Sequence, residues 1–180
     1  MDEVAPKMSR ENNPVWVVYD KLRSARLNVK YYGRRLQSVE RWNFTIELVL
    51  LASAPTSAIA GLWFWQNPIG RNIWQYFGIA AAVAAVLKPI LGFSRQMKDF
   101  ESVLSGYRTL EYDLMEIKVL IEQRQKYDAT LQGELKKAMQ REKLLVGKTP
   151  EASESRRVKR RCEAEVLAEL PTDSFFVPEE

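Results

Sequence analysis

The sequence predicts an all-α membrane protein, in which a two-helix transmembrane hairpin joins an N-terminal amphipathic helix to a long, coiled-coil-like cytoplasmic helix. The apolar residues are concentrated in one block, because between Trp42 and Ser94 the only charges are Glu47, Arg71 and Lys88. A heptad repeat follows that block. The mean hydropathy of −0.30 resembles that of a soluble protein only because it averages the apolar block with densely charged flanks.

The composition excludes several kinds of catalytic site. The 180 residues contain no histidine and one cysteine, Cys162, so histidine bases, histidine metal sites and an intrachain disulfide are absent. None of the eight glycines forms a phosphate-binding loop. We therefore expect no catalytic residue, no metal site and no cofactor, and a function other than catalysis. The acidic, non-apolar start of the chain also predicts no cleavable signal peptide.

The N-terminal part reads as a disordered segment, 1–13, followed by an amphipathic helix over 14–41. Asn13 precedes Pro14 as a helix cap precedes a proline at the first helical position. Apolar residues then recur every three or four positions, and the opposite face is basic. We expect that face to lie on the membrane surface, with nucleic acid as a weaker alternative. Its residues include Arg26, Lys30, Arg34 and Arg35.

Two apolar runs predict the transmembrane helices, at 42–65 and 74–94, with an external turn at 66–73. Each run can cross a hydrocarbon core roughly 30 Å thick. Pro55 and Pro89 predict kinks. Residues 21–41 hold seven Lys or Arg and one acid, whereas the turn holds only Arg71. The positive-inside rule then places both termini in the cytoplasm.

Glu47 and Lys88 are charges inside the predicted spans, each near the cytoplasmic end. Such charges are costly in a bilayer, about 2.5–3.5 kcal/mol each. An antiparallel hairpin places them at similar depth, where they could form an ion pair within one hairpin or between subunits. Two other interpretations stay open: both side chains extend to the nearby interface, or they line a pore.

The segment 95–146 contains no proline and predicts one long cytoplasmic helix, followed by a charged, flexible tail at 147–180. Its apolar residues alternate steps of three and four, the period of a coiled-coil seam. The seam then shifts to a neighbouring stripe after Ile121. It could close an intrachain bundle against the N-terminal helix or join subunits into an oligomer. The seam consists of Phe100, Val103, Tyr107, Leu110, Leu114, Ile117 and Ile121.

This order of parts resembles the SLATT domain family, the two-transmembrane effectors associated with bacterial nucleotide-second-messenger and SLOG-sensor defence systems. The resemblance covers about residues 15–145. It rests on YYGRRLQSVERW, ELVLLASAPTSAIAG, LKPILGFS and QMKDFESVLSGYRTLEYDLMEI. It implies an effector that perturbs the inner membrane through a pore when a sensor protein or nucleotide signals.

The expected function is therefore that of an oligomeric anti-phage effector, which permeabilises or depolarises the bacterial inner membrane in abortive infection. The expected partners are the lipid bilayer, further copies of the chain, and a sensor protein or nucleotide signal from the same defence locus. Two alternatives remain: a membrane-anchored helical scaffold that recruits a partner protein, and a small housekeeping channel subunit.

Overall fold

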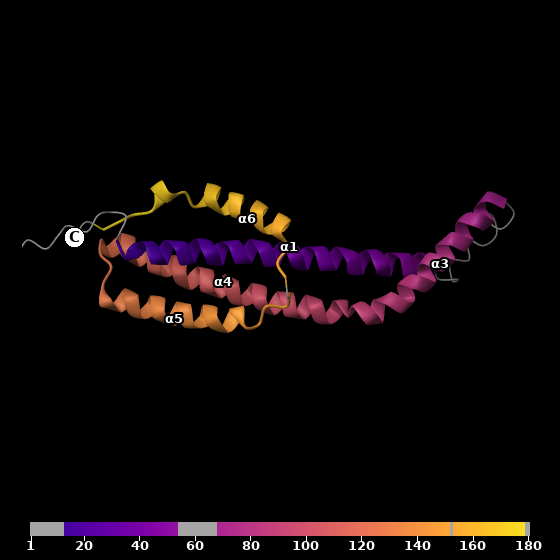
Figure 1. Ribbon diagram of the computed structural model, residues 1–180, viewed down its shortest axis with the longest axis horizontal. Coiled ribbons are helices and arrows are strands. Elements are labelled where there is room, and N and C mark those ends of the chain that lie inside the picture. Colours follow the sequence, from indigo (N-terminus) through magenta and orange to yellow (C-terminus); the bar gives the residue numbers. More distant parts are fainter. Residues whose placement is uncertain (1–12, 54–67, 152, 179–180) are drawn as a thin grey trace, which may run out of the picture. The chain divides into compact units, whose positions relative to one another are not determined.

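The computed structural model describes residues 13–53, 68–151 and 153–178, and every regular element in these ranges is a helix (Figure 1). This confirms the predicted all-α class. No strand occurs in the described part of the chain. The elements are α1 (Val15–Ser53), α3 (Pro68–Leu91), α4 (Phe93–Arg124), α5 (Ala129–Val146), α6 (Arg156–Glu169) and the short 3₁₀-helix η2 (Thr172–Ser174).

The chain divides into two compact units. One, which we call the bundle unit, comprises residues 1–34 and 99–180, and the other, the apolar unit, comprises residues 35–98. The helices α1 and α4 each contribute to both units. Each unit is described by itself below.

Helix α1 begins at the predicted cap. The side-chain oxygen of Asn13 accepts a hydrogen bond from the backbone N–H of Val15 at 3.0 Å, which satisfies one of the unpaired donors of the first turn. The helix then runs without interruption to Ser53, so the expected amphipathic helix and the beginning of the first expected span form one element. The remainder of that span, with Pro55, lies outside the described residues.

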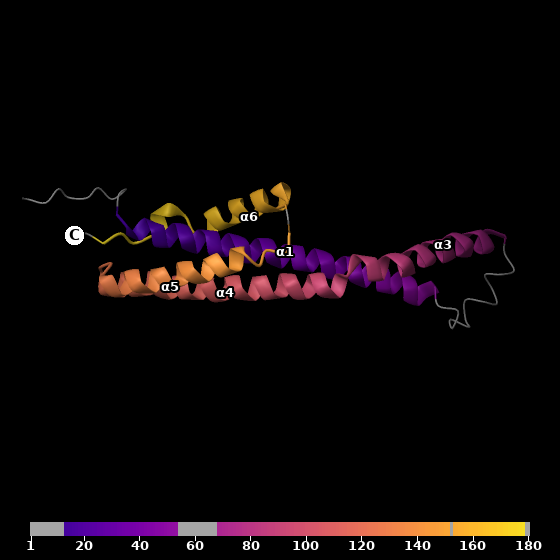
Figure 2. The same ribbon diagram turned by 60° about the horizontal axis from the view of Figure 1, so that its bottom comes forward.

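In the bundle unit, α1 lies between α6 on one side and the α4–α5 pair on the other (Figures 1 and 2). Ion pairs join α1 to both helices of that pair: Arg26 meets Glu111 of α4, and Lys21 meets Glu142 of α5. All seven seam residues are buried here, from 0% exposure at Ile121 to 4% at Phe100. The seam therefore closes an intrachain bundle, and it is not a free surface for joining subunits.

The expected single helix over 95–146 is wrong, because the chain reverses between α4 and α5. Gln125 adopts a left-handed φ of 55°, which ends α4. The Asp128 carboxylate then accepts a hydrogen bond from the backbone N–H of Leu131 at 3.0 Å and caps α5. Folding back lets Leu131, Leu135 and Ala138 enter the same core as the seam. This reversal explains why the apolar stripe shifts in the sequence.

The expected flexible tail at 147–180 also differs from the structure. It contains α6 and η2, and its buried residues are Cys162, Val166 and Phe175. These side chains are too few to form a core of their own, and they are ordered because they pack against the rest of the bundle unit.

In the apolar unit, α3 begins at Pro68, so the predicted turn at 66–73 is largely helical. Proline suits the first helical position, because its fixed φ is already helical and its missing N–H has no helical partner to lose. The helix continues through Pro89 and ends at Leu91, and the next residue, Gly92, has a left-handed φ of 56°. The expected kink at Pro89 stays a prediction.

Helix α3 is long and apolar enough to cross a membrane, with 24 residues and a mean hydropathy of 1.4 over its most apolar stretch. Only 6% of that stretch is buried within the protein. Among the described residues it is the one helix that meets these criteria. A second span is not shown, because positions 54–65 lie outside the described residues.

The buried seam predicts a large difference between neighbouring substitutions on α4. Leu114 is 1% exposed, so Leu114→Ala should lower the free energy of unfolding by about 2–5 kcal/mol through lost burial and the cavity it leaves. Tyr112 is 76% exposed, and Tyr112→Ala should change it by roughly 0.5 kcal/mol or less. Thermal and denaturant unfolding of the detergent-solubilised chain, followed by circular dichroism, measures both. Equal effects would contradict the intrachain seam.

Candidate functional site

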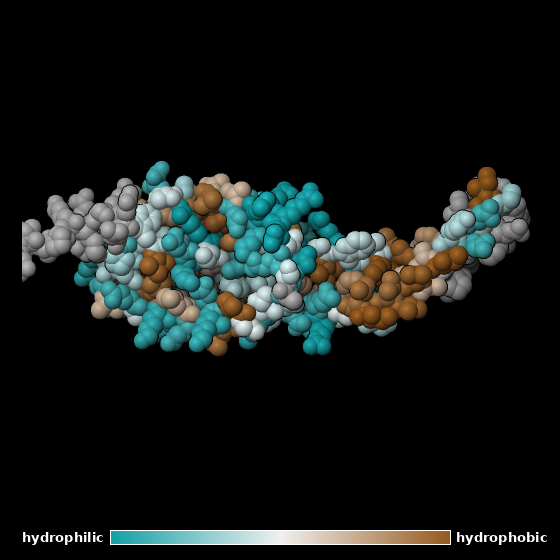
Figure 3. All heavy atoms as spheres, viewed as in Figure 1, coloured by the Kyte–Doolittle hydropathy of each residue, from teal (hydrophilic) through white to brown (hydrophobic). Residues whose placement is uncertain are grey.

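The first candidate site is a surface of exposed apolar side chains on the apolar unit (Figure 3). Soluble monomers rarely expose a continuous apolar patch beyond a few hundred Å², so a surface of this kind marks a membrane or protein contact. We call it the apolar surface. From α1 it includes Trp42, Phe44, Leu48 and Leu51, and from α3 it includes Ile69, Tyr76, Ile79, Val83, Val86 and Ile90.

The structure brings Glu47 and Lys88 together inside this unit. The Lys88 ammonium donates to Oε1 of Glu47 at 3.0 Å, and the Asn43 amide donates to the same oxygen at 3.1 Å. Both charged side chains are half-exposed. The two residues therefore form an ion pair within one chain. The membrane hairpin that would contain them stays a prediction. The pore-lining interpretation of the two residues stays a prediction.

The second candidate site is the basic face of α1, which the sequence placed on the membrane surface. In the structure, three of the four predicted residues of this face form ion pairs with acids of other helices. Arg26 pairs with Glu111 and Glu169, at 2.8 and 3.0 Å. Lys30 and Arg34 pair with acids of α6, and Arg35 belongs to the apolar unit. The expected membrane-surface role of Arg26, Lys30 and Arg34 is therefore corrected: they hold α6.

We call the contact between α1 and α6 the α6 clasp. Its central pair is Arg34 with Glu165, where one guanidinium nitrogen donates to both carboxylate oxygens at 2.6 and 2.7 Å. Another nitrogen of the same group donates to the Cys162 sulfur at 3.2 Å. Cys162 and Val166 are the only two residues of α6 that are buried. The contact therefore combines a row of half-exposed ion pairs with the burial of two side chains.

The acids of the α6 clasp are stabilised in their charged form. The hydrogen bond from Arg34 lowers the pKa of Glu165, and the hydrogen bond from Lys30 lowers the pKa of Glu169. Both carboxylates face solvent, so water and salt screen these pairs. The clasp should therefore respond to pH and ionic strength more than the apolar core does.

An aromatic contact fixes the end of the chain beyond α6, and we call it the C-terminal latch. The ring of Phe175 stacks on Tyr19 with centroids 4.1 Å apart, and the guanidinium of Arg23 lies 4.9 Å from its centre. The Tyr19 hydroxyl donates to the backbone oxygen of Phe176. Burial raises the pKa of Tyr19 to about 12. The latch and the clasp together tie residues 156–178 to α1.

Sequence reasoning missed Glu165, Glu169 and Phe175 as partners of α1. The acids of α6 recur four apart and match bases that also recur four apart, Arg26, Lys30 and Arg34. The matched spacing was a usable signal. The apolar SFFV segment was a second one, although the sequence does not say which surface receives it.

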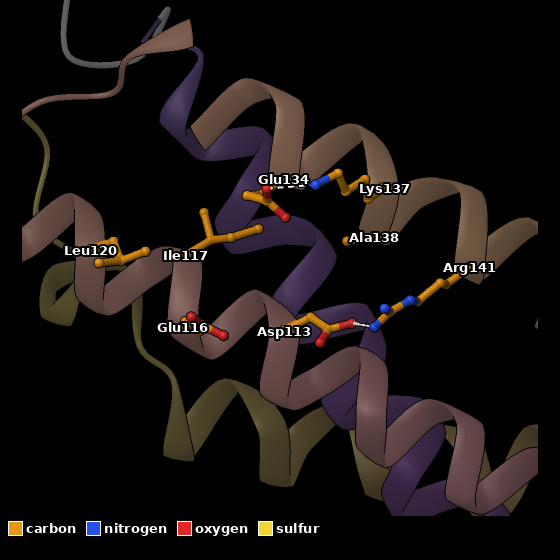
Figure 4. Close-up of a pocket in the computed structure, with 8 residues that line it drawn as sticks. All are labelled: Asp113, Glu116, Ile117, Leu120, Glu134, Lys137, Ala138 and Arg141. Atoms are coloured by element: carbon orange, nitrogen blue, oxygen red, sulfur yellow. Dashed lines mark hydrogen bonds and ion pairs between the residues drawn. The ribbon is translucent and has the colours of Figure 1, made fainter. Parts of the chain in front are cut away.

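A shallow depression of about 100 Å³ lies between α4 and α5 (Figure 4). Four of its five charged side chains pair within the protein: Arg141 with Asp113, and Lys137 with Glu134. The fifth is Glu116. No group of three metal-ligating side chains occurs in the part of the chain that the structure describes.

Comparison of the chain with protein-family models, curated proteins and solved structures found no match. The SLATT resemblance therefore rests on the sequence features alone.

The α6 clasp predicts a charge-dependent release of the C-terminal segment. Glu165→Gln with Glu169→Gln should make trypsin cleave the basic run at 156–161 severalfold faster, because the mutant amides keep the shape but lose the attraction to α1. Glu163→Gln is the matched control, since no ion pair includes that residue within the described ranges. Equal cleavage of the double variant and the control would contradict the clasp.

The same clasp should weaken in acid. The folded-state pKa of each acid lies below its ordinary value of 4.5, so the pairs contribute fully above that pH. Their contribution is lost as the pH falls through the lowered folded-state values. Hydrogen exchange of α6 amides, compared with those of α4 over the same range after correction for the intrinsic pH dependence, measures the loss. Uniform loosening of both helices would argue against a local effect.

The Glu47–Lys88 pair predicts coupling between the two residues. Glu47→Gln and Lys88→Met should each lower the assembled fraction in detergent, because each leaves one charge alone beside apolar surface. The double variant should recover much of it. Chemical crosslinking and sedimentation measure the fractions in a double-mutant cycle. Strict additivity would favour the interpretation in which each side chain reaches water independently.

Proposed function

We propose that this chain is a two-span, inner-membrane effector that assembles and permeabilises or depolarises the membrane on receiving a signal. The observation that carries the proposal is the apolar surface of α3 and the end of α1. A helix of 24 residues that buries only 6% of its apolar stretch needs an apolar surrounding. A bilayer supplies it along the full length of the helix.

The first span would consist of α1 from Trp42 to Ser53 together with the segment that follows. Its described portion is exposed and apolar, with Leu51 at 74% and Phe44 at 66%. The contact between Glu47 and Lys88 supports an antiparallel hairpin, because in such a hairpin these two ionisable groups would lie at one depth and could pair. Paired in this way, each charge would lower the free-energy cost of placing the other in a bilayer.

Assembly would use the spans and not the heptad seam, since the seam is occupied within the chain. Gly78 of α3 has open space where a side chain would begin, and Ala82 lies one turn further along the helix. Small residues four apart let helix backbones approach closely in lipid. We infer that this face of α3 packs against another copy of the chain.

The bundle unit would receive the signal, from a sensor protein or nucleotide of the same defence system. The α6 clasp is suited to that control, because it depends on half-exposed ion pairs and buries few apolar side chains. A partner that competes for its charges changes the surface of α1 without unfolding the apolar core.

The decisive experiment is induced expression in a bacterial host with a membrane-potential dye. The proposal expects rapid depolarisation by the wild-type chain, and Gly78→Leu should abolish it while the protein remains in the membrane fraction. Val83→Leu, on another part of the same helix, is the matched control and should retain activity. A membrane-integrated chain that never depolarises the cell would favour the scaffold alternative.

The expected topology needs a reporter other than Cys162, whose side chain is fully buried. In a Cys162→Ala background, Ser153→Cys should resist a membrane-impermeant maleimide in intact spheroplasts and react after lysis. Asn72→Cys, at the opposite end of the predicted hairpin, should react before lysis. Labelling of Ser153→Cys in intact spheroplasts would overturn the orientation.

A further inference from the structure

The outer side of α6 carries three exposed arginines, Arg156, Arg157 and Arg160, which we call the arginine face. Cys162 and Val166 mark the opposite side of the helix, which is buried in the bundle unit. Successive residues of a helix are about 100° apart, and this rotation turns all three arginines away from the buried side. The arginine face therefore points out of the bundle.

The arginine face holds the free charges of the basic run at 156–161. The other two bases of that run have acidic neighbours, because Lys159 pairs with Glu154 and Arg161 approaches Glu165 at 3.6 Å. Within the described ranges, no hydrogen bond or ion pair reaches any of the three arginines of the face. Glu165 and Glu169 bind the bases of α1. The helix thus presents its acids to α1 and its arginines to the outside.

The bundle unit does not neutralise this concentration of positive charge. Residues 156–163 contain five bases and one acid, Glu163, and the first turn of α6 contains no acid. Arg156 and Arg160 are four residues apart, a spacing at which like charges repel each other on a helix. The N-terminal end of a helix also disfavours cations. An anionic surface outside the chain would relieve this repulsion.

The start of α6 lies where the chain passes between the bundle unit and the apolar unit. The Ser155 backbone N–H donates to the Tyr31 hydroxyl at 2.9 Å. The next residue, Tyr32, lies with its ring centroid 6.3 Å from that of Phe100. Tyr31 and Tyr32 directly precede the apolar unit in the sequence, and Phe100 directly follows it, since that unit comprises residues 35–98. The arginine face therefore begins at the end of the bundle unit from which the apolar unit extends.

We propose that the arginine face binds the anionic lipid head groups of the cytoplasmic leaflet, beside the inserted apolar unit. The proposal rests on the membrane function proposed above and gives α6 a second contact, on the side opposite α1. Arginine binds phosphate oxygens through charge-assisted hydrogen bonds. Each base near an anionic leaflet strengthens binding about fivefold. The absence of aromatic residues from α6 favours lipid over single-stranded nucleic acid, which binds largely by base stacking.

The test measures contact between the start of α6 and lipid head groups in the full chain. The chain is reconstituted in nanodiscs of phosphatidylglycerol or of phosphatidylcholine with the same acyl chains, each with a small share of head-group nitroxide lipid. An uncharged fluorophore is attached to Ser153→Cys in a Cys162→Ala background, since Ser153 is exposed and lies just before α6. The nitroxide should quench it severalfold more strongly in phosphatidylglycerol than in phosphatidylcholine.

Charge variants assign that quenching to the arginine face. Arg156→Gln with Arg157→Gln should weaken the contact roughly 25-fold, about fivefold for each charge, whereas Arg156→Lys with Arg157→Lys should keep most of it. The matched control is Lys126→Gln with Lys136→Gln, which removes the same charge from two exposed residues. These lie in the α4–α5 turn and the first turns of α5, at the other end of the bundle unit (Figure 1). The control should keep the quenching.

Equal quenching in the two lipids would overturn the proposal. An equal loss in the arginine and lysine double variants would also overturn it, because it would show only diffuse attraction between a basic protein and an anionic surface. Loss of the quenching on addition of a stoichiometric single-stranded oligonucleotide would reassign the arginine face to nucleic acid. Alkaline carbonate extraction of host membranes separates the two levels: a chain that is extracted refutes the membrane function itself. A chain that stays in the membrane without lipid-dependent quenching refutes only the contact of the arginine face.

Discussion

The helix α1 lies in two different surroundings along one unbroken backbone: its first half is buried and its second half is exposed. The other helices are arranged around it. Its first half is buried in a core of aromatic and aliphatic side chains, where Tyr19 and Leu22 have no exposed surface. Its second half exposes large apolar side chains such as Leu51. Regular hydrogen bonding inside the helix lets the same backbone serve both parts, because no backbone group there needs water as a partner.

The bundle unit has two parts that depend on different interactions. The helices α4 and α5 contribute most of the apolar burial opposite α1, whereas α6 contributes two buried residues and a row of ion pairs. Apolar contacts change little with salt or moderate acid, but half-exposed ion pairs depend on both. The helix bundle can therefore stay folded while its C-terminal cover responds to solution conditions or to a competing partner.

The sequence predicted what depends on local patterns and missed what depends on distant partners. The cap at Asn13 and the periodic burial of Leu110 and Leu114 follow from spacing alone. The pairing of Glu47 with Lys88 was one of several interpretations that the sequence left open. The reversal at Gln125 contains neither glycine nor proline, so only the shifted apolar stripe marks it. The partnership of Arg34 with Glu165 joins residues 131 positions apart, and only the matched four-residue spacing of acids and bases pointed to it in the sequence.

The long sequence separation within the bundle has a consequence for biosynthesis. Arg26 meets Glu111 across 85 residues, Arg34 meets Glu165 across 131, and Tyr19 reaches Phe176 across 157. At roughly 5–20 residues per second, the buried face of α1 emerges on the order of ten seconds before α4 can cover it. Once they have been synthesised, α4 and α5 can pair almost at once, since only a short turn separates them. The nascent chain thus carries an uncovered apolar helix face next to the apolar unit before the bundle is complete. If the apolar unit enters a bilayer, as proposed, its insertion would precede completion of the bundle.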